Sequence, residues 1–164
     1  MTLSCPVISE DLKTLENVLT SIAIIAISLA LFLYWFRYTC QLILSTSTAK
    51  DCRTEVAANN RLKFLEVQSQ LGSAPPPSLD WCKRSLDCDF ALVNYMHRNT
   101  TQKAGSAGGV EELMLRLDYR FLGSWYLLVS RFSAAKARST LDEMSQIIGY
   151  FVDNFAQRAA GAAA

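Results

Sequence analysis

The chain has 164 residues, of which 51% are hydrophobic and 19% charged, and its formal net charge is +1. This near-neutral balance gives no electrostatic reason to expect nucleic acid as a partner. The cysteines number five, and an odd number disfavours a complete set of intramolecular disulfides. That count agrees with a reducing compartment.

An uncharged stretch runs from Asn17 to Phe36 and is followed by Arg37. A helix needs roughly 20 apolar residues to cross a hydrocarbon layer of about 30 Å. The leader is acidic and the stretch lacks a small-residue cleavage site, which disfavours a signal peptide. A chain this short could hardly surround a buried core helix. We therefore predict a short tail and helix start at 1–17, and a single transmembrane helix at 18–36 in contact with the lipid bilayer.

Amphipathic residues follow the span and predict one membrane interface. This interface belt consists of Tyr34, Trp35, Arg37 and Tyr38. Such side chains favour the headgroup level. Lys50 and Arg53 come next, whereas only Lys13 precedes the span. Basic residues collect on the inner side of a membrane, so we expect an integral membrane protein with a cytoplasmic carboxy-terminal domain.

Small residues recur within the span at a spacing of three and four. Ala23, Ala26 and Ala30 share one side of the predicted helix. Small side chains allow helices to approach closely in lipid, where packing drives association. This transmembrane packing face predicts a helical partner, either another copy of the chain or another membrane-protein subunit.

No proline or glycine lies between Pro6 and Gly72, and these residues are the main helix breakers. The sequence therefore predicts one helix from about residue 10 to about residue 71, so that a juxtamembrane helix at 37–72 continues the span. Hydroxyl residues make 46–48 its weakest part.

Residues 73–78 include three consecutive prolines, which predict a stiff linker. A helical bundle is expected at 79–158, and an alanine-rich disordered tail at 159–164. The fold class is thus all-α: a transmembrane helix extended into a long helix, followed by a small antiparallel helical bundle.

Three apolar faces support the bundle. The first has Leu79, Cys82, Leu86, Phe90, Val93 and His97; the second has Leu113, Leu117, Phe121, Leu128 and Phe132 in a helix that begins at Val110; the third has Leu141, Met144, Ile148, Phe151, Val152 and Phe155. Gly123 would allow a kink in the second helix. The third helix is expected to begin at a capping box, Thr140–Glu143.

Residue patterns typical of catalysis are missing from the sequence. Cys82, Cys88 and His97 lack the paired spacing of a zinc site, and no glycine-rich phosphate loop or nucleophile motif occurs. We expect no catalytic residue, cofactor or metal. A redox or accessory role for these three residues is a further alternative.

Large aromatic residues are the candidate partner-binding groups outside the membrane, because binding hot spots favour Trp and Tyr. They are Trp81, Trp125, Tyr126 and Tyr150. We therefore expect a non-enzymatic structural or assembly subunit of a homo-oligomeric or larger membrane complex. The alternative is a signalling or sensor protein whose long helix couples the span to the bundle.

Overall fold

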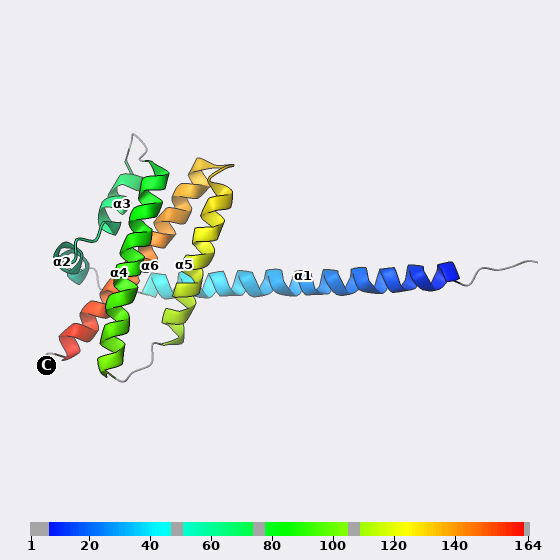
Figure 1. Cartoon of the computed structure of the whole chain (residues 1–164), viewed down its shortest axis with the longest axis horizontal. Coiled ribbons are helices and arrows are strands. Elements are labelled where there is room, and N and C mark those ends of the chain that lie inside the picture. Colours follow the sequence, from blue (N-terminus) through cyan, green and yellow to red (C-terminus); the bar gives the residue numbers. More distant parts are fainter. Residues whose placement is uncertain (1–6, 47–50, 74–77, 105–108, 163–164) are drawn as a thin grey trace, which may run out of the picture. The chain divides into compact units, whose positions relative to one another are not determined.

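The computed structural model describes residues 7–46, 51–73, 78–104 and 109–162, in which every regular element is a helix (Figure 1). The all-α class is therefore confirmed. The helices are α1 Val7–Thr46, α2 Asp51–Asn59, α3 Phe64–Leu71, α4 Leu79–Ala104, α5 Val110–Val129 and α6 Ala134–Ala162. Two compact units make up the chain, Met1–Thr39 and Cys40–Ala164.

The first unit consists of most of α1. The stretch Leu15–Ser45 of this helix has 31 residues and is long and apolar enough to cross a membrane. Its large hydrophobic side chains are exposed, among them Ile25 and Phe32. A hydrocarbon layer is the environment that suits an exposed apolar helix of this length.

The single helix expected from residue 10 to residue 71 is instead divided into α1, α2 and α3. The expected weak part at 46–48 is the point where α1 ends, while residues 47–50 lie outside the described ranges. The second interruption was not foreseen. Arg61 adopts the left-handed region, with a φ of 53°, and turns the chain between α2 and α3 without a glycine or proline.

Tertiary contacts explain this turn, because it brings two apolar side chains into the core. Leu62 and Phe64 are 8% and 1% exposed. The backbone N–H of Lys63 donates to Asp89 Oδ2 of α4 at 2.7 Å, which satisfies an amide at the start of α3. Packing and this hydrogen bond together override the helical propensity of the segment.

Helix α6 is the element against which α2, α3, α4 and α5 all pack. Figure 1 shows it beside α4 and α5. Its buried apolar residues are Ala137, Leu141, Met144, Ile147, Ile148, Tyr150, Phe151 and Val152. The core therefore surrounds the middle of this helix.

The capping box expected at Thr140–Glu143 is wrong, since α6 begins at Ala134. Thr140 lies within the helix and its hydroxyl donates to the carbonyl of Lys136 at 2.9 Å. Ser133 precedes the helix, and its Oγ accepts the Lys136 N–H at 3.4 Å. Alanine, lysine and arginine are strong helix formers, so the segment before Thr140 continues the helix.

The apolar face expected on α4 is confirmed, with Cys82, Leu86, Val93 and His97 buried. Phe90 stacks on Tyr119 of α5 with ring centroids 3.8 Å apart. Helix α4 continues to Ala104 and α6 to Ala162, so α6 extends into the expected tail. Prolines 75–77 lie outside the described residues.

An ionic cluster joins the ends of α4, α5 and α6. His97 Nε2 of α4 lies 2.6 Å from Glu112 Oε2 of α5, and Arg158 Nη2 of α6 donates to Glu112 Oε1. The His97 and Glu112 side chains are only 1% and 4% exposed. Arg158 Nη1 also lies 3.3 Å from His97 Nε2, so the three side chains contact one another.

We expect Glu112→Ala to lower the free energy of unfolding by about 3–5 kcal/mol, because it leaves Arg158 and His97 without their shared carboxylate. Denaturant unfolding in mild detergent measures the change. The matched control is Lys136→Ala, an exposed side chain, for which we expect a change within about 0.5 kcal/mol. Equal effects of the two variants would contradict a structural role for the cluster.

Burial raises the pKa of the Asp89 carboxyl above its ordinary value of 3.8, against the opposing effect of the Lys63 and Phe64 backbone N–H groups. The folded state therefore binds the proton more tightly than the unfolded state, and stability falls as pH rises through this window. Asp89→Asn keeps an acceptor but does not titrate. We expect the wild type to lose stability relative to this variant as the pH rises above about 3.8, the ordinary pKa of this carboxyl. Unfolding of both proteins at each pH tests this, and a relative gain for the wild type would contradict it.

Candidate functional site

Helix α5 carries two apolar faces. The first is buried and has Leu115, Tyr119, Leu122, Tyr126 and Val129, and α5 packs on α6. The second is exposed, and we call it the α5 stripe: Val110, Leu113, Leu117, Phe121, Trp125 and Leu128, continued by Phe132 just past the helix end. The apolar face that the sequence indicated for this helix is thus the exposed one.

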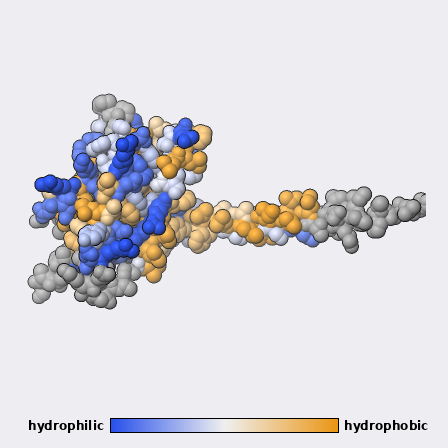
Figure 2. Space-filling view, in the orientation of Figure 1, coloured by the Kyte–Doolittle hydropathy of each residue, from blue (hydrophilic) through white to orange (hydrophobic). Residues whose placement is uncertain are grey.

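The α5 stripe is continuous because its residues recur every three or four positions along one helix. Gly123 does not interrupt α5. Exposed fractions range from 40% for Phe121 to 81% for Phe132. Figure 2 shows hydrophobic surface at the edge of the bundle where α5 lies.

The size of the stripe separates it from ordinary surface. A half-exposed side chain of this size presents about 100 Å², so the seven residues expose on the order of 700 Å². Monomeric proteins rarely expose contiguous apolar patches larger than a few hundred Å². Arg116 and Arg120 lie on α5 between the stripe and the buried face. An apolar strip with a polar flank is typical of a binding surface.

The four candidate partner-binding aromatics have different surroundings. Trp125 is 43% exposed and belongs to the stripe, whereas Tyr126 and Tyr150 are buried at 2% and 9%. The Tyr126 hydroxyl donates to Asp80 Oδ1 at 3.3 Å. Burial and the nearby Asp80 carboxylate raise the pKa of Tyr126 to about 12. The two tyrosines therefore pack within the bundle and leave the set of surface candidates.

Trp81 lies at the edge of a second feature, a hollow of about 380 Å³. The hollow is lined by Arg61, Lys63, Trp81, Arg84, Ser85, Cys88, Asp89 and Leu92. Lys63 Nζ lies 6.0 Å from the centre of the Trp81 ring. Six of the lining residues lie on α4, and Arg61 and Lys63 lie in the connection between α2 and α3.

The cysteines are separated by burial. Cys40 and Cys82 are buried and Cys88 is exposed. Burial raises the pKa of the Cys82 thiol, which keeps it protonated and unreactive. His97 is buried in the ionic cluster, so of these residues only Cys88 is exposed.

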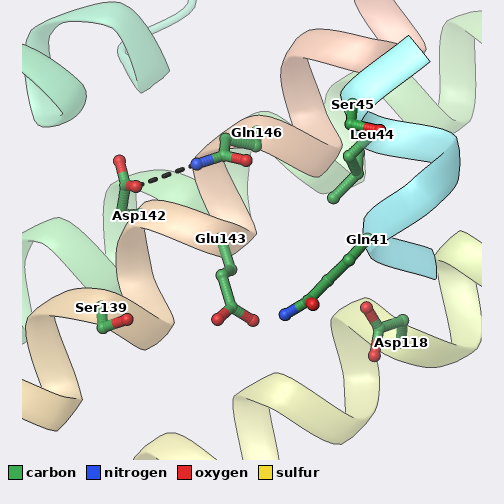
Figure 3. Close-up of a pocket in the computed structure, with 8 residues that line it drawn as sticks. All are labelled: Gln41, Leu44, Ser45, Asp118, Ser139, Asp142, Glu143 and Gln146. Carbon is green, nitrogen blue, oxygen red and sulfur yellow. Dashed lines mark hydrogen bonds between the residues drawn. The ribbon is translucent and has the colours of Figure 1, made fainter. Parts of the chain in front are cut away.

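A third feature is a hollow of about 340 Å³ beside the end of α1. Its polar residues include Gln41 of α1, Asp118 of α5 and Glu143 of α6, and Figure 3 shows the Gln41 side chain between the two carboxylates. Asp142 accepts a hydrogen bond from Gln146 Nε2 at 2.9 Å. Among the described residues, no group of three or more histidine, cysteine or acidic side chains is arranged to hold a metal ion.

The predicted membrane residues lie on α1. Ala23, Ala26 and Ala30 are exposed along the span. In the interface belt, the Trp35 and Tyr38 rings meet edge to face with centroids 6.0 Å apart. Their exposure leaves both sets accessible to lipid or to another helix.

No protein-family model, no curated protein and no solved structure matches this chain. Its function is therefore inferred from its own surfaces. Outside α1, the α5 stripe is the largest group of exposed hydrophobic side chains among the described residues, and it occurs in a chain with a helix suited to cross a membrane. Exposed apolar surface of this extent marks a site of protein or membrane contact.

Proposed function

We propose that the chain is a non-enzymatic, single-pass assembly subunit of a membrane complex. The carrying observation is the α5 stripe, a helix-length apolar face that the bundle leaves uncovered. In this proposal α1 anchors the subunit in the bilayer, the bundle lies on the cytoplasmic side, and the stripe binds another protein chain.

The side-chain chemistry supports a binding role over catalysis. The one histidine of the sequence is His97, and it is 1% exposed beneath its contact with Glu112. A general acid or base must reach the substrate directly or through one water. The α5 stripe offers accessible apolar surface, and apolar surface serves association.

Within the bilayer, the proposal assigns a second contact to the transmembrane packing face. Ala23, Ala26 and Ala30 let a neighbouring helix approach closely, and this approach gains van der Waals contact in lipid. The two surfaces are on different segments of one chain, so their contributions to assembly can be measured separately.

Replacing Leu117 and Trp125 together by glutamine should dissociate the complex without unfolding the bundle. Both side chains are about half exposed, so we expect the free energy of unfolding to change by no more than about 0.5 kcal/mol. The native mass of protein extracted in mild detergent should fall to that of a single chain. The matched control replaces Leu92 and Leu127 by glutamine. These two side chains lie outside the stripe and are 40% and 66% exposed. A control as disruptive as the stripe variant would count against this surface.

We expect Ala26→Leu to weaken assembly by about threefold or more, because the larger side chain separates packed transmembrane helices. The matched control is Ser28→Leu, which makes a similar increase in size on the opposite side of α1. Association of the two variants in lipid vesicles, followed by energy transfer between labelled chains, measures the difference. Equal association of both variants would remove the transmembrane face from the proposal.

A further inference from the structure

The residues of the α5 stripe are spaced almost symmetrically about Phe121. Phe121 lies at its middle, and Leu117 and Trp125 lie four residues before and after it. Val110 and Phe132 lie eleven residues before and after it. The intermediate pair, Leu113 and Leu128, departs from this symmetry by a single residue. All of these side chains are exposed.

A face with this arrangement is complementary to its own reversed copy. A two-fold symmetric dimer uses the same patch on both subunits, so residue i must meet residue j and j must meet i. Two antiparallel α5 helices related by an axis at Phe121 meet this condition. Each Leu117 then faces Trp125 of the second copy, and each Val110 faces Phe132.

Charge favours the same direction of pairing. Glu111 is exposed near the amino-terminal end of the stripe, and Arg131 is exposed near its other end. Antiparallel packing brings the acidic end of each stripe toward the basic end of the other, and it also opposes the helix dipoles favourably. Parallel packing would bring like charges together. Arg120 lies on the flank of the stripe, from which its long side chain can reach water.

The available area fits a dimer. A stable protein–protein interface buries about 800 Å² on each partner, and the stripe exposes on the order of 700 Å² at about 100 Å² for each half-exposed side chain. Phe121 and Trp125 supply the large aromatic anchors that dominate such interfaces. A second copy therefore covers nearly the whole stripe.

We infer that the occupant of the α5 stripe is a second copy of this chain, packed antiparallel about a two-fold axis at Phe121. This inference rests on the proposed function and names the partner. It makes the smallest assembly a symmetric homodimer joined through α5.

Disulfide cross-linking in native membranes tests this arrangement, with variants that each carry one added cysteine. Under mild oxidation, Phe121→Cys should form a dimer, because the two thiols meet at the axis. Leu117→Cys alone should not, because its two copies lie about 12 Å apart along the helices, beyond the Cα separation that a disulfide spans. Leu117→Cys coexpressed with Trp125→Cys should form the mixed dimer. Leu127→Cys, exposed outside the stripe, and the unsubstituted chain with its five cysteines give the background.

Two results would overturn the inference: no Phe121→Cys dimer above background, or a Leu117→Cys dimer as abundant as that of Phe121→Cys. The native mass of the unsubstituted chain separates this failure from failure of the proposed function. If other proteins co-purify in stoichiometric amounts and Phe121→Cys forms no dimer, the chain is an assembly subunit with a different partner, and only the homodimer inference fails. A single chain in mild detergent without that dimer would overturn both.

Discussion

The arrangement of the second unit depends on the burial of α6. Four helices pack against it, and its middle turns expose almost no apolar side chain. A single central helix can be covered by a small number of neighbours, but these neighbours cannot all cover one another. Helix α5 uses one face to cover α6 and keeps a second apolar face outside. The stripe is thus exposed because α5 packs on α6 with its other face.

Polar contacts then determine how firmly this edge helix is held. Glu112 fixes the beginning of α5 to α4 and α6 through His97 and Arg158. Further along, the Tyr119 hydroxyl donates to Asp87 of α4 at 3.2 Å. A binding face on a helix fixed in this way loses little conformational freedom when a partner binds. The buried ionic cluster and the exposed stripe therefore act together, one positioning the helix and the other presenting its surface.

Much of this architecture follows from sequence patterns, and the exceptions have physical reasons. The apolar run identifies a helix long and apolar enough to cross a membrane. Periodicity identifies the buried face of α4 and most of the α6 core. It cannot decide between the two apolar faces of α5, because burial depends on which neighbours the chain brings to the helix. The turn at Arg61 cannot be predicted from the local sequence either. The hydrogen bond that stabilises it joins the Lys63 N–H to Asp89, which is distant in sequence. The capping box at Thr140 was outweighed by the helix-forming residues before it.

The combination of a span and a helix-length stripe also bears on how strong the proposed contact must be. An interface of about 800 Å² per partner often gives only modest affinity in dilute solution. The proposed membrane anchor would confine every copy to a thin layer, which would raise the effective concentration of one copy around another. Packing of small residues in the bilayer adds a second, weak contact on the same chain. Two modest surfaces on different helices of one chain can then support a stable assembly that neither would support alone.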